Sequence, residues 1–166
     1  MLEKLKGLFG LSKADNTAVI LAPVAGESVP LQEVPDPTFS QELLGKGVAI
    51  LPTSGRIVAP VDGKVLGIFR TSHAVTLGAE NGAEILIHIG IDTVKLAGQH
   101  FTPHVVKGDL VKAGDLLIEA DLEAIQAAGY NTIVPVLVCN TDEFNDVAGS
   151  FGTMAELDTL ITLQKK

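Results

Sequence analysis

Residues 84–94 alternate in the manner typical of a β-strand. Every second residue from Ile85 to Ile91 is an isoleucine, and residues two apart on a strand share one face of a sheet. We expect this β-branched face to pack into the main core. The opposite face carries five residues of different chemistry: Glu84, Leu86, His88, Gly90 and Asp92. The pattern therefore predicts a sheet protein in which one histidine faces away from the main core.

A second strand is predicted upstream, over residues 71–77, and Asn81-Gly82 between the two runs favours a tight hairpin turn. A two-residue loop sets Glu80 opposite Ala83. Counting outward pairs Val75 with His88, His73 with Gly90, and Thr71 with Asp92. In this register the two histidines are diagonal neighbours, about 7–8 Å apart at the backbone, so both imidazoles can reach one small group.

Two histidines near a hydroxyl and a carboxylate favour phosphoryl chemistry. One neutral imidazole nitrogen can attack phosphorus, while the other donates a hydrogen bond that fixes the tautomer. The chain has one cysteine and no zinc-binding spacing around either histidine, so we expect no metal and no cofactor. A zinc hydrolase built on His73 and His88 is the competing hypothesis, and it lacks an evident third ligand.

Residues 82–94 resemble the phosphorylation-site motif of the glucose-type IIA phosphocarriers of the bacterial phosphoenolpyruvate:sugar phosphotransferase system, with His88 at the phosphorylated position. Thr71-Ser72-His73-Ala74 resembles the segment with that family's second active-site histidine, and residues 59–63 resemble another recurrent block. The resemblance runs from about residue 19 to the C-terminus. It implies a β-sandwich that accepts phosphate from the carrier protein HPr and passes it to a cysteine of a permease IIB domain.

The resemblance also implies residue roles. Nε2 of His88 accepts the phosphoryl group, the Gly90 carbonyl holds Nδ1–H, His73 orients the phosphoryl group, and Thr71 bonds either that group or His73. Asp92 is expected at the rim, facing a basic residue of a partner. An apolar surface around the site would exclude water during transfer. Its expected members are Leu86, on the His88 face, and by resemblance Phe39, Leu44, Phe69 and Val94.

A regulatory binding module is the alternative function. The same face would then dock transporters or enzymes, and phosphorylation would switch the contact.

Composition narrows the partners further. The formal charge of −8 and only 12 basic residues in 166 argue against nucleic acid, which needs clustered lysine and arginine. A lone cysteine forms no intrachain disulfide, as expected of a cytoplasmic protein. We predict that Cys139 is a small buried residue on a strand over residues 134–138.

We expect two parts in the chain. Residues 1–16 comprise an amphipathic helix (residues 1–11) and a polar linker, and the helix could bind an anionic membrane surface weakly. It lacks the continuous apolar run of a signal peptide or a membrane span. Residues 17–166 should form a single IIA domain.

From residue 17 onward, short apolar runs cut by Pro, Gly and Asp predict an all-β fold, an antiparallel sandwich with a few short helical turns. Residues 22–29 recur as residues 59–65, each copy with an Ala-Pro-Val turn, which indicates an internal duplication. Residues 105–119 resemble the hammerhead turns of biotinyl and lipoyl carriers. The expected helical turns are Leu122–Ala128 capped by Asp121, Asp142–Val147 capped by Thr141, and Phe39–Leu44.

Overall fold

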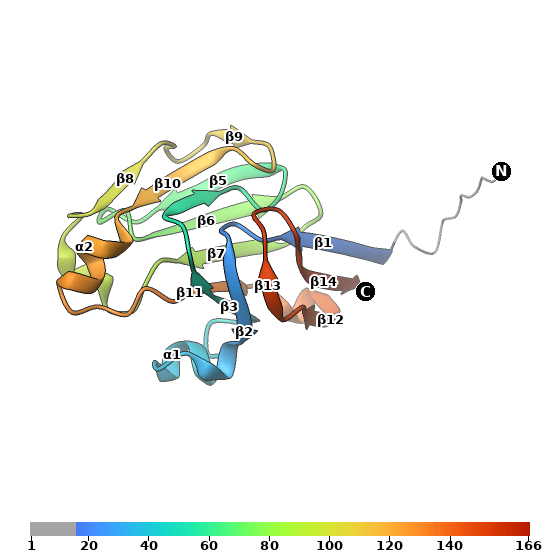
Figure 1. Ribbon diagram of the computed structural model, residues 1–166. Coiled ribbons are helices and arrows are strands. Elements are labelled where there is room, and N and C mark those ends of the chain that lie inside the picture. The colour runs from blue at the N-terminus through green and yellow to red at the C-terminus, as the bar shows by residue number, and fades with distance from the viewer. Residues whose placement is uncertain (1–15) are drawn as a thin grey trace.

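A computed structural model describes residues 16–166, which form antiparallel sheets with two short helices (Figure 1). The strands are β1 (Thr17–Leu21), β2 (Gly26–Pro30), β3 (Lys46–Pro52), β4 (Arg56–Val58), β5 (Gly63–Ile68), β6 (Ala74–Ala79), β7 (Glu84–His88), β8 (Phe101–Pro103), β9 (Leu110–Val111), β10 (Leu116–Ala120), β11 (Val134–Val138), β12 (Phe144–Gly149), β13 (Gly152–Met154) and β14 (Thr159–Lys165). The helices are α1 (Pro37–Ser40) and α2 (Leu122–Ala127), with 3-10 turns at Leu31–Glu33, Thr93–Leu96 and Thr141–Glu143. The helix predicted over residues 1–11 lies outside the described residues.

The strands form one large sheet and two small ones. The large sheet has eight strands in the order β13-β2-β3-β11-β7-β6-β5-β9, and the small sheets have the orders β1-β14-β12 and β4-β10-β8. Every strand pair is antiparallel. The predicted all-β antiparallel fold is confirmed. None of the helices in residues 16–166 is long and apolar enough to cross a membrane.

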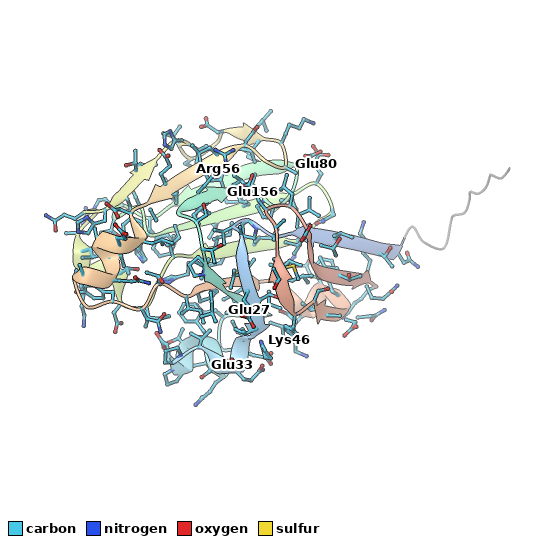
Figure 2. All side chains as sticks on the ribbon, viewed as in Figure 1. Glu27, Glu33, Lys46, Arg56, Glu80 and Glu156 are labelled. Atoms are coloured by element: carbon cyan, nitrogen blue, oxygen red, sulfur yellow. The ribbon has the colours of Figure 1, made fainter. Side chains whose placement is uncertain are left out.

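The topology is internally duplicated. Counted inward from its two edges, the large sheet pairs equivalent strands: β13 with β9, β2 with β5, β3 with β6, and β11 with β7. In the two small sheets, β1, β14 and β12 have the same order as β4, β10 and β8. Arg56 and Glu156, labelled in Figure 2, join the two halves through an exposed ion pair of 3.2 Å. Such surface pairs contribute little, about 0–1 kcal/mol.

The repeated Ala-Pro turns form the seam between the halves. Leu21 N–H donates to the Pro60 carbonyl at 3.0 Å, and Val58 N–H donates to the Pro23 carbonyl at 2.8 Å. The next residue in each copy is an alanine, whose N–H donates to a loop of one of the small sheets. Ala22 N–H donates to the Asp158 carbonyl at 2.7 Å, and Ala59 N–H donates to the Asp115 carbonyl at 2.8 Å. The sequence repeat therefore serves backbone pairing.

The large sheet packs a core on each face. Ile85, Ile87 and Ile89 are fully buried in the main core, as their alternation predicts. The opposite face carries a second cluster, in which Phe39 and the segment before it cover Leu86 and its neighbours on the sheet. Ile91 belongs to this second cluster, because the chain has left the strand by then and no longer alternates. The face of His88 is thus partly a packed interior.

The predicted register of the β6–β7 hairpin is wrong by one residue. Ala79 N–H donates to the Ala83 carbonyl at 2.8 Å, which makes the loop three residues long, Glu80 to Gly82. His88 therefore lies opposite Ala74 rather than Val75, and His73 and Thr71 precede the strand instead of pairing with Gly90 and Asp92. Gly82 takes the left-handed φ of +96° that such a loop requires at its last position.

The helix predictions have mixed outcomes. Helix α2 confirms the predicted cap, because the Asp121 carboxylate accepts a bond from Ala124 N–H at 3.1 Å. The helix expected from Phe39 begins two residues earlier, at Pro37, because Asp36 provides the cap, and it ends at Ser40. The helix predicted over Asp142–Val147 is wrong.

At that position one 3-10 turn leads directly into β12, which pairs along β14, so sheet pairing overrides the local capping signal. Cys139 is also misplaced by the sequence prediction. It lies just beyond the end of β11 and is exposed, because the strand's buried run stops at Val138.

Candidate active site

His88 is the last residue of β7 and is partly buried. Its Nδ1 lies 2.8 Å from the Gly90 carbonyl oxygen. A carbonyl oxygen only accepts, so Nδ1 must carry the proton and Nε2 is the unprotonated nitrogen of the neutral ring. Gly90 adopts φ +81°, and this left-handed turn directs its carbonyl back toward His88. The backbone beyond the strand therefore fixes the tautomer.

His73 lies one residue before β6 and is buried, with 3% of its surface exposed. Its Nδ1 is 2.6 Å from the hydroxyl of Thr71, across a turn in which Ser72 takes φ +60°. The centroids of the His73 and His88 rings are 4.9 Å apart, and the rings meet nearly at right angles, at 83°. The prediction that both imidazoles converge is confirmed, although the register behind it was wrong.

Two phenylalanine rings enclose the histidines. The Phe39 ring lies 4.9 Å from the His88 ring, and the Phe69 ring lies 5.3 Å from the His73 ring, edge to face. Such aromatic contacts contribute about 0.5–1.5 kcal/mol each beyond the area they bury. They restrict ring rotation and remove water from one side of each imidazole.

Burial favours the neutral form of both histidine rings. Burial, and to a smaller extent the proximity of His88, together lower the pKa of His73 to about 4. Burial also lowers the pKa of His88, while the Gly90 carbonyl and the carboxylates of Asp36 and Asp92 oppose that shift. The site therefore combines a neutral imidazole with nearby negative charge that favours a cationic ring.

Acid should destabilise the fold through His73. Between its ordinary pKa of 6.5 and its folded value of about 4, only the unfolded chain binds the proton, so stability is complete above pH 6.5 and falls as the pH drops toward 4. At about pH 5 this loss is roughly 2 kcal/mol. Urea unfolding near pH 7 and pH 5 should show that His73→Gln loses about 2 kcal/mol less than the wild type. Equal losses of stability in the wild type and in His73→Gln would contradict the assigned burial of His73.

The residues predicted to contact partners fall into two groups. Phe69, Leu44 and Val94 are exposed by 44–51%, whereas Leu86 and Phe39 are only 4–6% exposed and lie within the second cluster. The expectation that all five form an open apolar surface is corrected, because α1 and the preceding turn cover the sheet there. Leu44 also lines a shallow cavity of about 280 Å³ with Cys139.

Two carboxylates lie close enough to influence His88. Asp92 is exposed and begins the Thr93–Leu96 turn with φ +60°. Asp36 caps α1, accepting a bond from Thr38 N–H at 2.9 Å, and sequence reasoning missed it as a site residue. The pattern around Asp36 indicates a helix start, and only the folded chain brings it near a residue 52 positions later.

Among the described residues, the ring contacts of the site involve His73 and His88 and neither of the other two histidines. His104 Nε2 lies 2.8 Å from a Glu119 carboxylate oxygen on the surface. His100 adopts a left-handed φ of +77°, a conformation that glycine tolerates best. Within residues 16–166, no three or more His, Cys, Asp or Glu side chains gather as a metal site would require.

Comparisons with known proteins address the family directly. Residues 18–144 match the family model described as phosphoenolpyruvate-dependent sugar phosphotransferase system, EIIA 1. The glucose-specific EIIA component of Oceanobacillus iheyensis is 46% identical over 143 residues, which cover 86% of this chain and 87% of that protein. The beta-glucoside-specific EIIBCA component of Bacillus subtilis is 53% identical over 127 residues, 76% of this chain and 21% of that longer protein.

A solved structure shows the same fold. The glucose permease IIA from Mycoplasma capricolum superposes with a TM-score of 0.81 at 34% identity, over 88% of this chain and 95% of that one. The chain therefore belongs to the EIIA 1 family of the phosphoenolpyruvate-dependent sugar phosphotransferase system.

Proposed function

We propose that this protein is a phosphocarrier that accepts a phosphoryl group from phospho-HPr on Nε2 of His88 and passes it to a cysteine of a permease IIB domain. The observation that supports this most is the bond from Nδ1–H of His88 to the Gly90 carbonyl, which leaves Nε2 with a free lone pair. We also propose that residues 17–166 work as one IIA domain in the cytoplasm. The name EIIBCA of a longer relative supports a IIB partner, because it joins A with B and C.

In the first half-reaction, the Nε2 lone pair attacks phosphorus as the N–P bond to the HPr histidine breaks and its electron pair returns to that imidazole. The His88 ring then carries positive charge, shared over both nitrogens. The Gly90 carbonyl on Nδ1–H and the carboxylates of Asp36 and Asp92 stabilise that charge. Asp92, being exposed, can also attract a basic side chain of the donor.

His73 and Thr71 hold the phosphoryl oxygens in this scheme. If the Thr71 hydroxyl donates to Nδ1 of His73, the proton of the neutral His73 ring lies on Nε2 and is available to an oxygen. Positioned donors of this kind account for most of phosphoryl-transfer catalysis. Onward transfer breaks the His88 N–P bond while a IIB thiolate sulfur attacks phosphorus, and the ring returns to its neutral state.

His73→Gln separates the two half-reactions. Glutamine keeps a donor of similar reach and resembles the neutral ring, so we expect phosphorylation by phospho-HPr to be slower but measurable. The negative phosphoryl group on His88 favours a protonated His73 ring, which glutamine cannot supply, so onward transfer should fall by about 10²–10³. Rapid-quench kinetics of each step measures this, with His104→Gln on the surface as the control. Wild-type rates in both steps would make His73 a bystander.

A label chase tests the proposed function. Phosphoenolpyruvate labelled with ³²P, enzyme I and HPr should label this protein, and addition of a IIB domain should move the label to its cysteine. A IIB domain with that cysteine changed to serine should leave the label in place. Labelled HPr that never labels this protein would overturn the proposal. The regulatory alternative stays a prediction.

A further inference from the structure

The chain leaves β7 through residues 89–91, and backbone bonds hold this segment from two sides. The bonds are Ile89 N–H to the His73 carbonyl at 2.8 Å, Gly90 N–H to the Ile133 carbonyl at 2.9 Å, and Ile91 N–H to the Asn131 carbonyl at 3.0 Å. Two of the three acceptors lie in residues 131–133, just before β11. That short segment therefore determines where the Gly90 carbonyl points.

Pro135 removes one hydrogen bond between β7 and β11, so the backbone after His88 needs the bonds to residues 131 and 133. Strands β7 and β11 pair with Ile87 opposite Val136, so the next step along both strands sets Pro135 opposite His88. Pro135 has no N–H and cannot donate to β7 at that position. The bonds farther along, to residues 131 and 133, must then align the backbone that follows His88.

The supporting segment is itself held by a side chain. Asn131 Oδ1 accepts a bond from Ile133 N–H at 2.9 Å, which closes a turn between the two residues whose carbonyls hold Gly90 and Ile91. Ile133 is buried, whereas Asn131 is exposed, so the asparagine side chain can be changed without opening the core. A Cβ on Gly90 would lie 2.9 Å from the Asn131 carbonyl oxygen, so the two segments are in tight contact.

We propose that Asn131 is a positioning residue for His88: its amide oxygen holds the 131–133 turn, the turn holds the Gly90 carbonyl, and that carbonyl keeps the proton on Nδ1. The kinetic consequence rests on the proposed role of His88. The tautomer of His88 can be measured without any phosphoryl transfer. Failure of the positioning role of Asn131 can therefore be distinguished from failure of the proposed function.

The test compares Asn131→Ala with Asn131→Asp, which keeps a carboxylate oxygen to accept from Ile133 N–H. Long-range ¹H–¹⁵N correlation spectra distinguish a protonated from a bare ring nitrogen. In the wild type we expect a single His88 tautomer with Nδ1 protonated. Asn131→Ala should show a mixture of tautomers and about a ten-fold slower phosphorylation by phospho-HPr, since small displacements of reacting groups cost rates of that order. Asn131→Asp should restore both.

Asn81→Ala is the matched control. Asn81 Oδ1 makes the same bond, to Ala83 N–H at 3.0 Å, at the opposite end of β7, so both alanine variants lose one equivalent hydrogen bond. Asn81→Ala should keep the wild-type tautomer and rate. If Asn131→Ala matches Asn81→Ala in both readouts, or if Asn131→Asp fails to restore them, the positioning role is overturned.

Discussion

His88→Ala is expected to fold as the wild type does and to accept no phosphate from phospho-HPr. The substitution removes the nitrogen proposed to form the N–P bond. It costs the fold two ring contacts, with Phe39 and His73, and one bond to a carbonyl at the end of β7, about 2–4 kcal/mol together. Intact-mass analysis after incubation with phosphoenolpyruvate, enzyme I and HPr measures acceptance, and thermal unfolding confirms the fold.

The control is His104→Ala, which removes a surface histidine paired with Glu119 and should label fully. A His88→Ala protein that still labels completely would place the acceptor elsewhere, and His73 would then be the first residue to test. Loss of folding in His88→Ala would contradict its placement at the edge of the second cluster.

Gly90→Ala should both weaken the fold and slow the reaction. The left-handed φ of +81° costs an alanine about 1 kcal/mol. The new methyl group would lie 2.6 Å from Thr93 Cγ2, and relief of such overpacking costs typically about 1–3 kcal/mol more. The displaced carbonyl would release Nδ1 of His88, so phosphorylation should fall by roughly 10–100-fold. Urea unfolding and rapid-quench labelling measure the two effects.

Gly82→Ala measures the cost of placing an alanine at a left-handed φ without any steric clash. Gly82 also adopts a left-handed φ, of +96°, but a Cβ there meets no atom within 4 Å. It should lose only about 1 kcal/mol and keep the wild-type rate. If Gly90→Ala is no worse than Gly82→Ala in either measurement, the Gly90 carbonyl does not control His88.

The strand pattern of residues 84–94 was sufficient to predict the central part of the fold. Four isoleucines at alternate positions left little choice but a sheet with one buried face, and three of them lie in the main core. The Ala-Pro repeat likewise indicated duplication, because each copy must provide the same backbone geometry at the seam. Prediction from the local sequence pattern was correct where a segment determines its own conformation.

The register and the site's surroundings depended on distant segments and could not be predicted so well. Asn81-Gly82 suits a two-residue loop, yet the loop has three residues, because pairing with β11 as well as β6 sets the position of β7. The rings of His73 and His88 still converge, since both lie where the strands end and the backbone departs from strict alternation. Asp36 and Asn131 reach the site only through tertiary packing, and no motif near either residue signals it.

The measurement that tests the central claim most directly identifies the phosphorylated atom in the wild-type protein. The protein is incubated with phosphoenolpyruvate, enzyme I and HPr, then examined by ³¹P and ¹H–¹⁵N NMR with the His88 ring assigned. The account predicts one acid-labile phosphoryl group on Nε2 of His88, with Nδ1 protonated throughout. Phosphate on His73, on Nδ1 of His88, or on a side-chain oxygen in an acid-stable linkage would contradict it.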